Sequence, residues 1–220
     1  MEFVFDEDQQ LLHSTVRDFL EGEVTPEVVR GLWETETGRS RELWKKLAEI
    51  GIPGLLVPEA HGGMGLSELD AVLILEEAGR SGLAEPVIST AAVAVPLLAE
   101  LGGELASAWL PRVAAGEAVV AVGHPVSPFV EDAHVAELLL LPHGDALHAV
   151  TRDAARMTPQ PANDPARRIA SVEFEPTAAT CVAEGARAAA LLDAALDRGA
   201  LACAAGALGA GDHKGVAFSP

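Results

Sequence analysis

The sequence has 220 residues, enough for one large domain or two small ones, and 49% of them are hydrophobic. Asp and Glu outnumber Lys and Arg by 33 to 15, which leaves a formal net charge of −18. A nucleic-acid-binding protein needs a basic face to neutralise phosphates, and an anionic membrane surface would repel this chain. We therefore expect neither nucleic acid nor a membrane as a partner.

The two cysteines, Cys181 and Cys203, fit neither a disulfide framework nor a metal site, and the seven histidines show no ligand spacing. Residues 1–10 are acidic and polar, unlike a secretory signal. The stretch from Val87 to Leu101 contains Pro96 and is too short for a membrane span, so it is interpreted as a buried helix. These features predict a cytoplasmic protein without a bound metal.

Cap residues mark the helices of the first hundred residues. Four residues are predicted to cap helix starts: Asp6, Thr25, Ser40 and Ser67. Gln9 and Asp70 each follow a cap by three residues, which is the spacing of a capping box. Gly51 is placed to end the third helix. Two more helices are predicted over residues 87–102 and 104–114.

The pattern changes near Gly116, where short apolar runs alternate with Pro and Gly. Strands are predicted at residues 118–122, 135–141, 146–150 and 169–174. An Ala/Leu-rich helix follows over residues 183–208. The fold class is therefore α+β, with a helical domain over residues 1–116, a small β domain over 117–182 and a further helix with a tail over 183–220.

A glycine-rich loop from Val57 to Gly65 reads VPEAHGGMG, and the helix after it contains EEAGR from Glu76 to Arg80. The segments from Trp44 to Gly51 and from Trp109 to Glu117 lie upstream and downstream in the same order. Together these four motifs resemble the acyl-CoA dehydrogenase family, whose loop reads P-E-x-x-G-G-x-G. The resemblance covers residues 1–123 well and 124–210 loosely.

The resemblance implies an N-terminal helical domain, a middle β domain and the first helix of a C-terminal helical domain. It implies FAD as the cofactor, an acyl-CoA as the substrate and α,β-dehydrogenation of the thioester as the reaction. It also implies a homo- or hetero-oligomer of such chains. Because the family has further C-terminal helices, we expect the chain to be a truncated member that is inactive alone.

The family holds its flavin with a T-E-P-x-A-G-S-D segment, and the corresponding stretch here is Gly123–Ser127. Val122, Gly123 and Ser127 are the residues that the resemblance places beside the cofactor, with His124 near its edge. The alternative is that they form a plain strand end and turn. The family's later W-x-T strand has no counterpart in the sequence.

Removing the proton beside a thioester needs a carboxylate placed at that carbon. One family position for this base aligns with Gly199, which has no carboxylate, and the nearby Asp197 is the substitute to consider. The alternative for Asp197 is a solvated charge on a helix. The sequence therefore assigns no catalytic residue.

Other segments allow a functional and a structural interpretation. The small residues from Val87 to Leu97, including Ala91 and Ala94, could leave room for an acyl group or pack closely. The glycines at 62, 63 and 65 could cradle a phosphate or form a tight loop. Glu76 is expected to lie on a helix surface and Glu77 to be a packing neighbour.

Three functions follow. The first is an acyl-CoA dehydrogenase or part of one. The second is a non-catalytic partner subunit of a heteromeric acyl-CoA dehydrogenase, which the altered segment at Gly123 favours. The third is a helical scaffold without flavin. We also expect exposed apolar faces on the helix at 183–208 to promote association.

Overall fold

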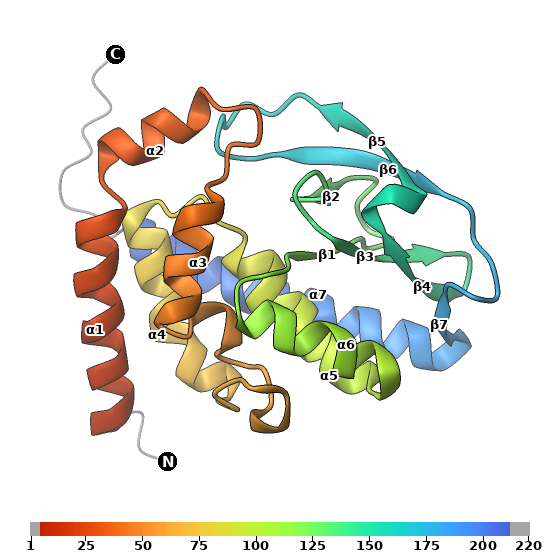
Figure 1. Cartoon of the computed structure of the whole chain (residues 1–220), viewed down its shortest axis with the longest axis horizontal. Coiled ribbons are helices and arrows are strands. Elements are labelled where there is room, and N and C mark those ends of the chain that lie inside the picture. The colour runs from red at the N-terminus through yellow and green to blue at the C-terminus, as the bar shows by residue number, and fades with distance from the viewer. Residues whose placement is uncertain (1–4, 212–220) are drawn as a thin grey trace.

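The computed structural model describes residues 5–211. The N-terminal helices lie at one end of the molecule and the strands at the other, while the later helices run along beneath the strands (Figure 1). The α+β fold predicted from the sequence is confirmed. The last helix, predicted to end at residue 208, extends to Gly211, and the rest of the expected tail, residues 212–220, lies outside the described residues.

The bounds of the α-helices are α1 Glu7–Glu23, α2 Pro26–Trp33, α3 Arg41–Glu49, α4 Glu68–Ser81, α5 Val95–Leu101, α6 Gly103–Ala114 and α7 Gly185–Gly211. Of the α-helices, α1, α2, α3 and α4 begin directly after the predicted cap residues. Asp6 accepts from the backbone N–H of Gln9 at 2.8 Å, and the Gln9 side chain accepts from the backbone N–H of Asp6 at 2.9 Å. Ser40 accepts from the N–H of Leu43 at 3.1 Å. At the start of α4, Ser67 instead donates its N–H and its hydroxyl to the Asp70 carboxylate.

The helix predicted over residues 87–102 is not a single α-helix. Residues Val87–Ala94 form a π-helix, η3, which leads directly into α5. The N–H of Val95 donates to the carbonyl of Thr90, five residues earlier. Pro96 explains the wider turn, because its ring would clash with the carbonyl of Ala92 in an α-helix.

The strands form two small sheets. Their bounds are β1 Val120–Val122, β2 Val130–Glu131, β3 Leu138–His143, β4 Ala146–Thr151, β5 Ala155–Gln160, β6 Ile169–Phe174 and β7 Cys181–Glu184. One sheet has the order β1-β3-β4-β7 and the other β2-β6-β5. β1 and β3 are parallel, and the other pairs are antiparallel. The sequence prediction missed β2, β5 and β7 and began β3 three residues early.

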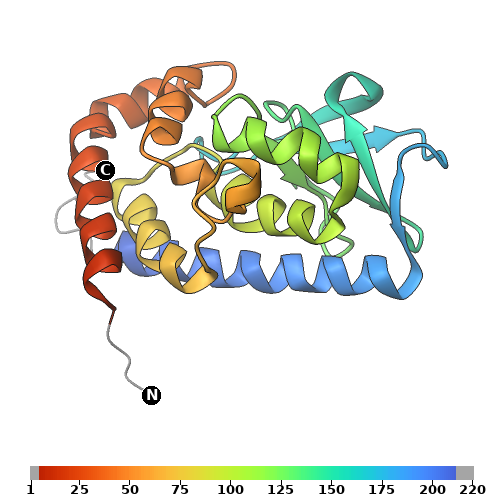
Figure 2. The same cartoon turned by 60° about the horizontal axis from the view of Figure 1, so that its bottom comes forward.

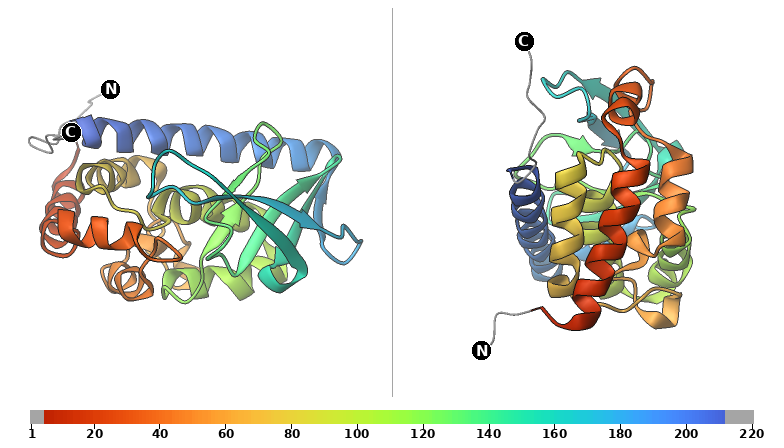
Figure 3. Two further views of the ribbon diagram at one scale, coloured as in Figure 1. Left: turned by 90° about the horizontal axis from the view of Figure 1, so that it is seen from above. Right: turned by 90° about the vertical axis from the view of Figure 1, so that its left-hand side faces the viewer.

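The long helix α7 runs the length of the molecule, beside α4 at one end and the strands at the other (Figure 2). Figure 3 shows α4 between α1 and α7. The two helices touch through glycines: a Cβ on Gly79 would lie 1.9 Å from the carbonyl oxygen of Gly206, and one on Gly209 would lie 1.8 Å from that of Glu76. The backbones of α4 and α7 can approach this closely only because these positions lack a Cβ.

A buried carboxylate joins α1 to α4. Glu77 is 2% exposed and accepts from Arg17 at 2.6 Å, while His13 lies 2.7 Å away and Arg80 at 3.2 Å. Burial raises the pKa of Glu77, but the hydrogen bonds from Arg17 and His13 outweigh it, so the pKa is lowered overall. The expectation that Glu77 is a packing residue is confirmed, and the buried carboxylate is held by ion pairs.

Candidate functional site

The flavin-side residues predicted from the sequence lie where β1 ends. Val122 is the last residue of β1, Gly123 is buried and Ser127 is exposed in the turn that follows. A Cβ on Gly123 would meet Leu141, Pro142 and Val130 at 3.1–3.3 Å, so the glycine lets the strand end pack against β3 and β2. The three residues are thus close together in the fold as well as in the sequence.

The hydrogen-bonding groups of this turn are used within the turn and its sheet. The N–H of Gly123 donates to Leu140 at 2.8 Å, and that of Ser127 donates to His124 at 3.0 Å. The N–H of Val126 donates to His124 Nδ1 at 3.2 Å. The Ser127 hydroxyl donates to the carbonyl of Phe129 and accepts from its N–H. Pro125 and Pro128 have no N–H to offer.

A flavin ring needs donors aimed at its nitrogen and oxygen atoms, and the family supplies hydroxyls and amides for them. Because Gly123 and Ser127 donate elsewhere, these residues do not fit that task as the structure has them. One group in the turn is free to bind a flavin atom: His124 Nε2 is buried and has no hydrogen-bond partner within residues 5–211. Val126 and Phe129, at 69% and 38% exposed, give the turn an apolar outer surface.

The buried face of α7 carries no acid within the described residues. That face is built from small and apolar residues: Ala188, Leu191, Leu192, Ala195, Ala202, Ala205 and Gly209. At the aligned base position, a Cβ on Gly199 would lie 3.6 Å from the Val93 side chain of η3. Asp197 is exposed on the outer side of the helix, which favours its interpretation as a solvated charge. Arg198 between them pairs with Glu68 and Glu100 at 3.0 and 2.6 Å.

The residues proposed to shape an acyl pocket are core residues. Ala91 is 3% exposed and Ala94 0% exposed, and each belongs to a different cluster of buried side chains. Of the two interpretations of these small residues, this burial favours close packing, because η3 turns this face toward the core. Ile88, Ser89 and Val93 are the half-buried residues of η3.

The glycine-rich loop is a tight loop rather than a phosphate cradle. The N–H groups of Met64, Gly65 and Leu66 donate to backbone carbonyls of residues 54, 57 and 55 at 2.9–3.0 Å. A Cβ on Gly63 would lie 2.2 Å from the carbonyl oxygen of Val57. The amides that a phosphate would need are thus turned inward, and the glycines allow the close approach.

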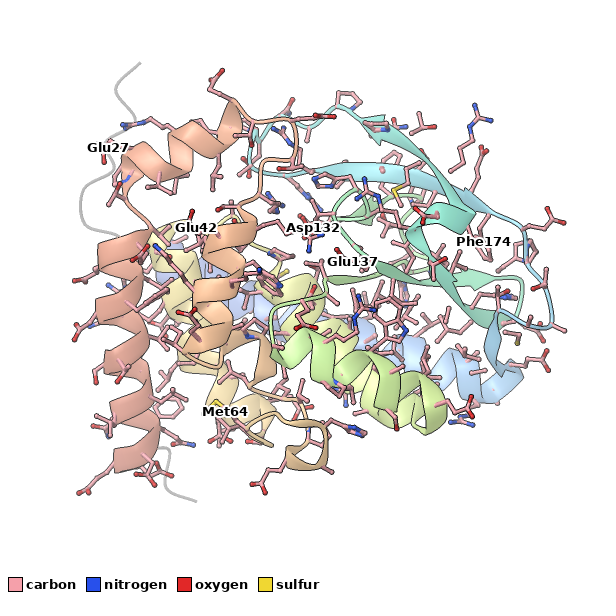
Figure 4. The ribbon with its side chains drawn as sticks, in the orientation of Figure 1. Glu27, Glu42, Met64, Asp132, Glu137 and Phe174 are labelled. Atoms are coloured by element: carbon pink, nitrogen blue, oxygen red, sulfur yellow. The ribbon has the colours of Figure 1, made fainter. Side chains whose placement is uncertain are left out.

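A polar junction joins the helical region to the strands, and the sequence analysis missed it. Arg39 and Asp132, 7% and 4% exposed, pair at 2.6 Å. Ser89 of η3 donates to the other Asp132 oxygen at 2.9 Å, and Asp132 has a φ of 58°. Arg41 pairs with Glu137. Figure 4 shows Asp132 and Glu137 between α3 and the strands. No local pattern could have revealed the Arg39–Asp132 pair, because 93 residues separate its members.

Within residues 5–211 no three His, Cys, Asp or Glu side chains group as metal ligands. Over the same residues no helix combines the length and apolar character that crossing a membrane requires.

Comparison with known proteins identifies the family. Residues 6–117, about half of the chain, match the model of the acyl-CoA dehydrogenase N-terminal domain. The chain belongs to the acyl-CoA dehydrogenase family. Among curated relatives, acyl-CoA dehydrogenase IpdE2 of Mycolicibacterium smegmatis is 33% identical over 168 residues, 76% of this chain and 51% of the relative. IpdE2 of Mycobacterium tuberculosis is 30% identical over 197 residues, 88% of this chain and 60% of the relative. The chain therefore spans 51–60% of the length of these two relatives.

Solved structures share the fold. The ChsE4–ChsE5 complex from Mycobacterium tuberculosis matches with a TM-score of 0.77 and 25% identity, over 95% of this chain and 65% of the solved one. An acyl-CoA dehydrogenase from Bacillus anthracis complexed with FAD matches with a TM-score of 0.78 and 20% identity, over 93% and 42%. The first is a ChsE4–ChsE5 complex, and the second is complexed with FAD.

Proposed function

We propose that the chain is part of an FAD-dependent acyl-CoA dehydrogenase, in which it serves as a partner subunit. The assembly removes two hydrogens from an acyl-CoA thioester. This chain supplies the helical scaffold and a small β domain, and other parts of the assembly supply the flavin contacts and the base. The proposal includes the three-part division at residues 116/117 and 182/183.

One observation carries the proposal. At the turn Gly123–Ser127, the groups that should reach a flavin donate within the protein. The second deficit is on α7, where Gly199 stands at a family base position. Without a positioned carboxylate, proton removal loses a factor of about 10²–10⁴ in rate. The two-chain ChsE4–ChsE5 neighbour supports a role in an assembly.

The test is anaerobic mixing of the chain with excess FAD and a series of acyl-CoAs, followed by flavin absorbance. We expect no bleaching by the isolated chain. Adding a full-length acyl-CoA dehydrogenase chain of the same organism should give bleaching faster than that chain gives alone. Bleaching by the isolated chain at an enzyme's rate would contradict the proposal, and Asp197→Asn would then show whether Asp197 is the base.

A second candidate is that this chain holds FAD itself. His124 Nε2 favours it, because a buried ring nitrogen without a partner could bind a flavin atom. Copurification of a yellow protein whose colour is lost in His124→Ala would support this candidate. A colourless preparation that stays colourless after FAD addition would exclude it.

A further inference from the structure

A pocket of about 130 Å³ lies at the polar junction, where the N-terminal end of α3 meets the start of η3 and the strands. Its apolar walls are Trp44, Pro86, Val119 and Val135. A cavity of ~150 Å³ accommodates benzene, so this pocket has room for a small ring or a short branched chain. The residues at the turn after β1 and on the buried face of α7 do not line it.

Cations converge on this pocket although the protein is acidic. Arg39, Arg41 and Arg152 all line it, out of 15 Lys and Arg residues in the whole chain. Asp132 pairs with Arg39, and Glu137 pairs with Arg41. The exposed side chain of Arg152 makes no hydrogen bond or ion pair with residues 5–211. Arg152 is therefore available to an anion.

Two further buried residues border the pocket. Trp44 is 1% exposed, and its indole Nε1 has no hydrogen-bond partner among the described residues. A buried N–H without an acceptor is costly. Glu85 is 6% exposed and accepts from the N–H of Ser40 at 2.7 Å, so it occupies the N-terminal end of α3.

We propose that this pocket binds a small organic carboxylate with an apolar body, its charge on Arg152 and Arg41 and its body against Trp44 and Val135. Inorganic anions lack the apolar part, and neutral molecules lack the charge. Because α3, the segment just before η3 and the connections beside β1, β2, β3 and β4 all contribute, the bound ligand would hold the helical region against the β domain.

Glu85 makes the binding depend on pH. Burial raises the pKa of Glu85 to about 7, against the opposing effects of the Ser40 N–H and Arg39. The charged groups facing it are Arg39 and Asp132, with Arg41, His134 and Arg152 across the pocket. Burial lowers the pKa of His134, so His134 adds no charge near pH 7. Below pH 7 the neutral Glu85 no longer repels an anion, so affinity should rise.

The experiment is isothermal calorimetry on the full chain at pH 6 with benzoate as the probe. Benzamide tests the charge and inorganic phosphate tests the apolar body. We expect benzoate to bind one to one and the other two at least about tenfold more weakly, since a charge-assisted hydrogen bond is lost or the apolar contact is missing. Equal binding of benzamide or of phosphate would overturn the proposal, as would no binding of benzoate.

Variants locate the site. Arg152→Gln should weaken benzoate binding roughly five- to tenfold, whereas Arg156→Gln, an exposed arginine of β5 outside the pocket, should leave it unchanged. Val135→Phe should block the pocket if the chain keeps its circular dichroism spectrum. Glu85→Gln should bind benzoate equally at pH 6 and pH 8. Wild-type affinity in Arg152→Gln, or loss in Arg156→Gln, would contradict the assignment.

Discussion

The contact between α4 and α7 and the junction between α3 and the strands hold the molecule together in different ways. In the first contact the two helix backbones touch directly, which depends on the absence of side chains at Gly79 and Gly209. The second depends on the buried Arg39–Asp132 pair and encloses a pocket. The first contact tolerates no added volume at Gly79 or Gly209 and should not respond to pH. The second should respond to charge, pH and ligands.

The largest effect is expected at the junction. Arg39→Met leaves the Asp132 carboxylate buried without its cation and should lower the free energy of unfolding by about 3–5 kcal/mol. Urea unfolding at pH 7 measures it. Arg30→Met, at an exposed position of α2, is the control and should change it by less than about 0.5 kcal/mol. A loss under about 1 kcal/mol in Arg39→Met would show that the pair matters little.

The next largest effect is a pH dependence of stability, which we expect at the junction between α3 and the strands and not at the contact between α4 and α7. The pKa of Glu85 is raised to about 7 in the folded protein, against an ordinary value of 4.5. Between pH 4.5 and 7 the folded chain therefore keeps a proton on Glu85 that the unfolded chain has released. Stability from this group is full below about pH 4.5 and is lost as pH rises through 7. Glu85→Gln should remove this loss, which is at most about 3 kcal/mol at pH 8. Glu104→Gln on the exposed surface should leave the wild-type pH profile, and an identical profile in Glu85→Gln would contradict the account.

The contact between α4 and α7 is tested by adding one methyl group. Gly79→Ala places a Cβ against the Gly206 carbonyl oxygen and should cost about 1–3 kcal/mol, even though alanine favours a helix. Gly206→Ala is the matched control, because its Cβ would meet nothing closer than 3.7 Å. It should be neutral or stabilising by about 1 kcal/mol. Equal effects in thermal unfolding would show that the contact is not as close as described.

The smallest effect on stability is expected on the outer face of α7. Leu196, Leu201 and Leu208 are 42%, 46% and 63% exposed, while the opposite face packs on α4 and η3. We expect self-association of the purified chain through this face. Leu208→Glu should reduce it in sedimentation velocity while changing stability by less than about 0.5 kcal/mol. Leu11→Glu on α1, at 66% exposed, should not reduce it. A wild-type chain that is monomeric at all concentrations would refute the expectation.

The sequence predicted what local chemistry determines. The caps at Asp6, Thr25 and Ser40 act over three residues, so their helices could be placed within a residue or two. The family motifs predicted the helical domain, which the comparison confirms. The π-helix was missed because its turn width depends on Pro96 and on the packing of its buried face.

Sites that depend on distant residues were not predictable. Ser127 could be chosen as a flavin contact, but its hydrogen bonds to Phe129 follow from the fold of the turn. Likewise Ala91 and Ala94 were suitably small, but the orientation of η3 buries them. Arg39 and Asp132 gave no signal in the sequence, because only the fold brings the segment before α3 and the segment after β2 together.

The most direct test of the proposed function is equilibrium dialysis of FAD against three samples: this chain, a full-length acyl-CoA dehydrogenase chain of the same organism, and their mixture. The account predicts that the isolated chain retains no stoichiometric FAD and that the mixture retains more than the full-length chain does alone. One FAD per isolated chain, reduced by His124→Ala, would contradict it and would place the cofactor at the turn after β1.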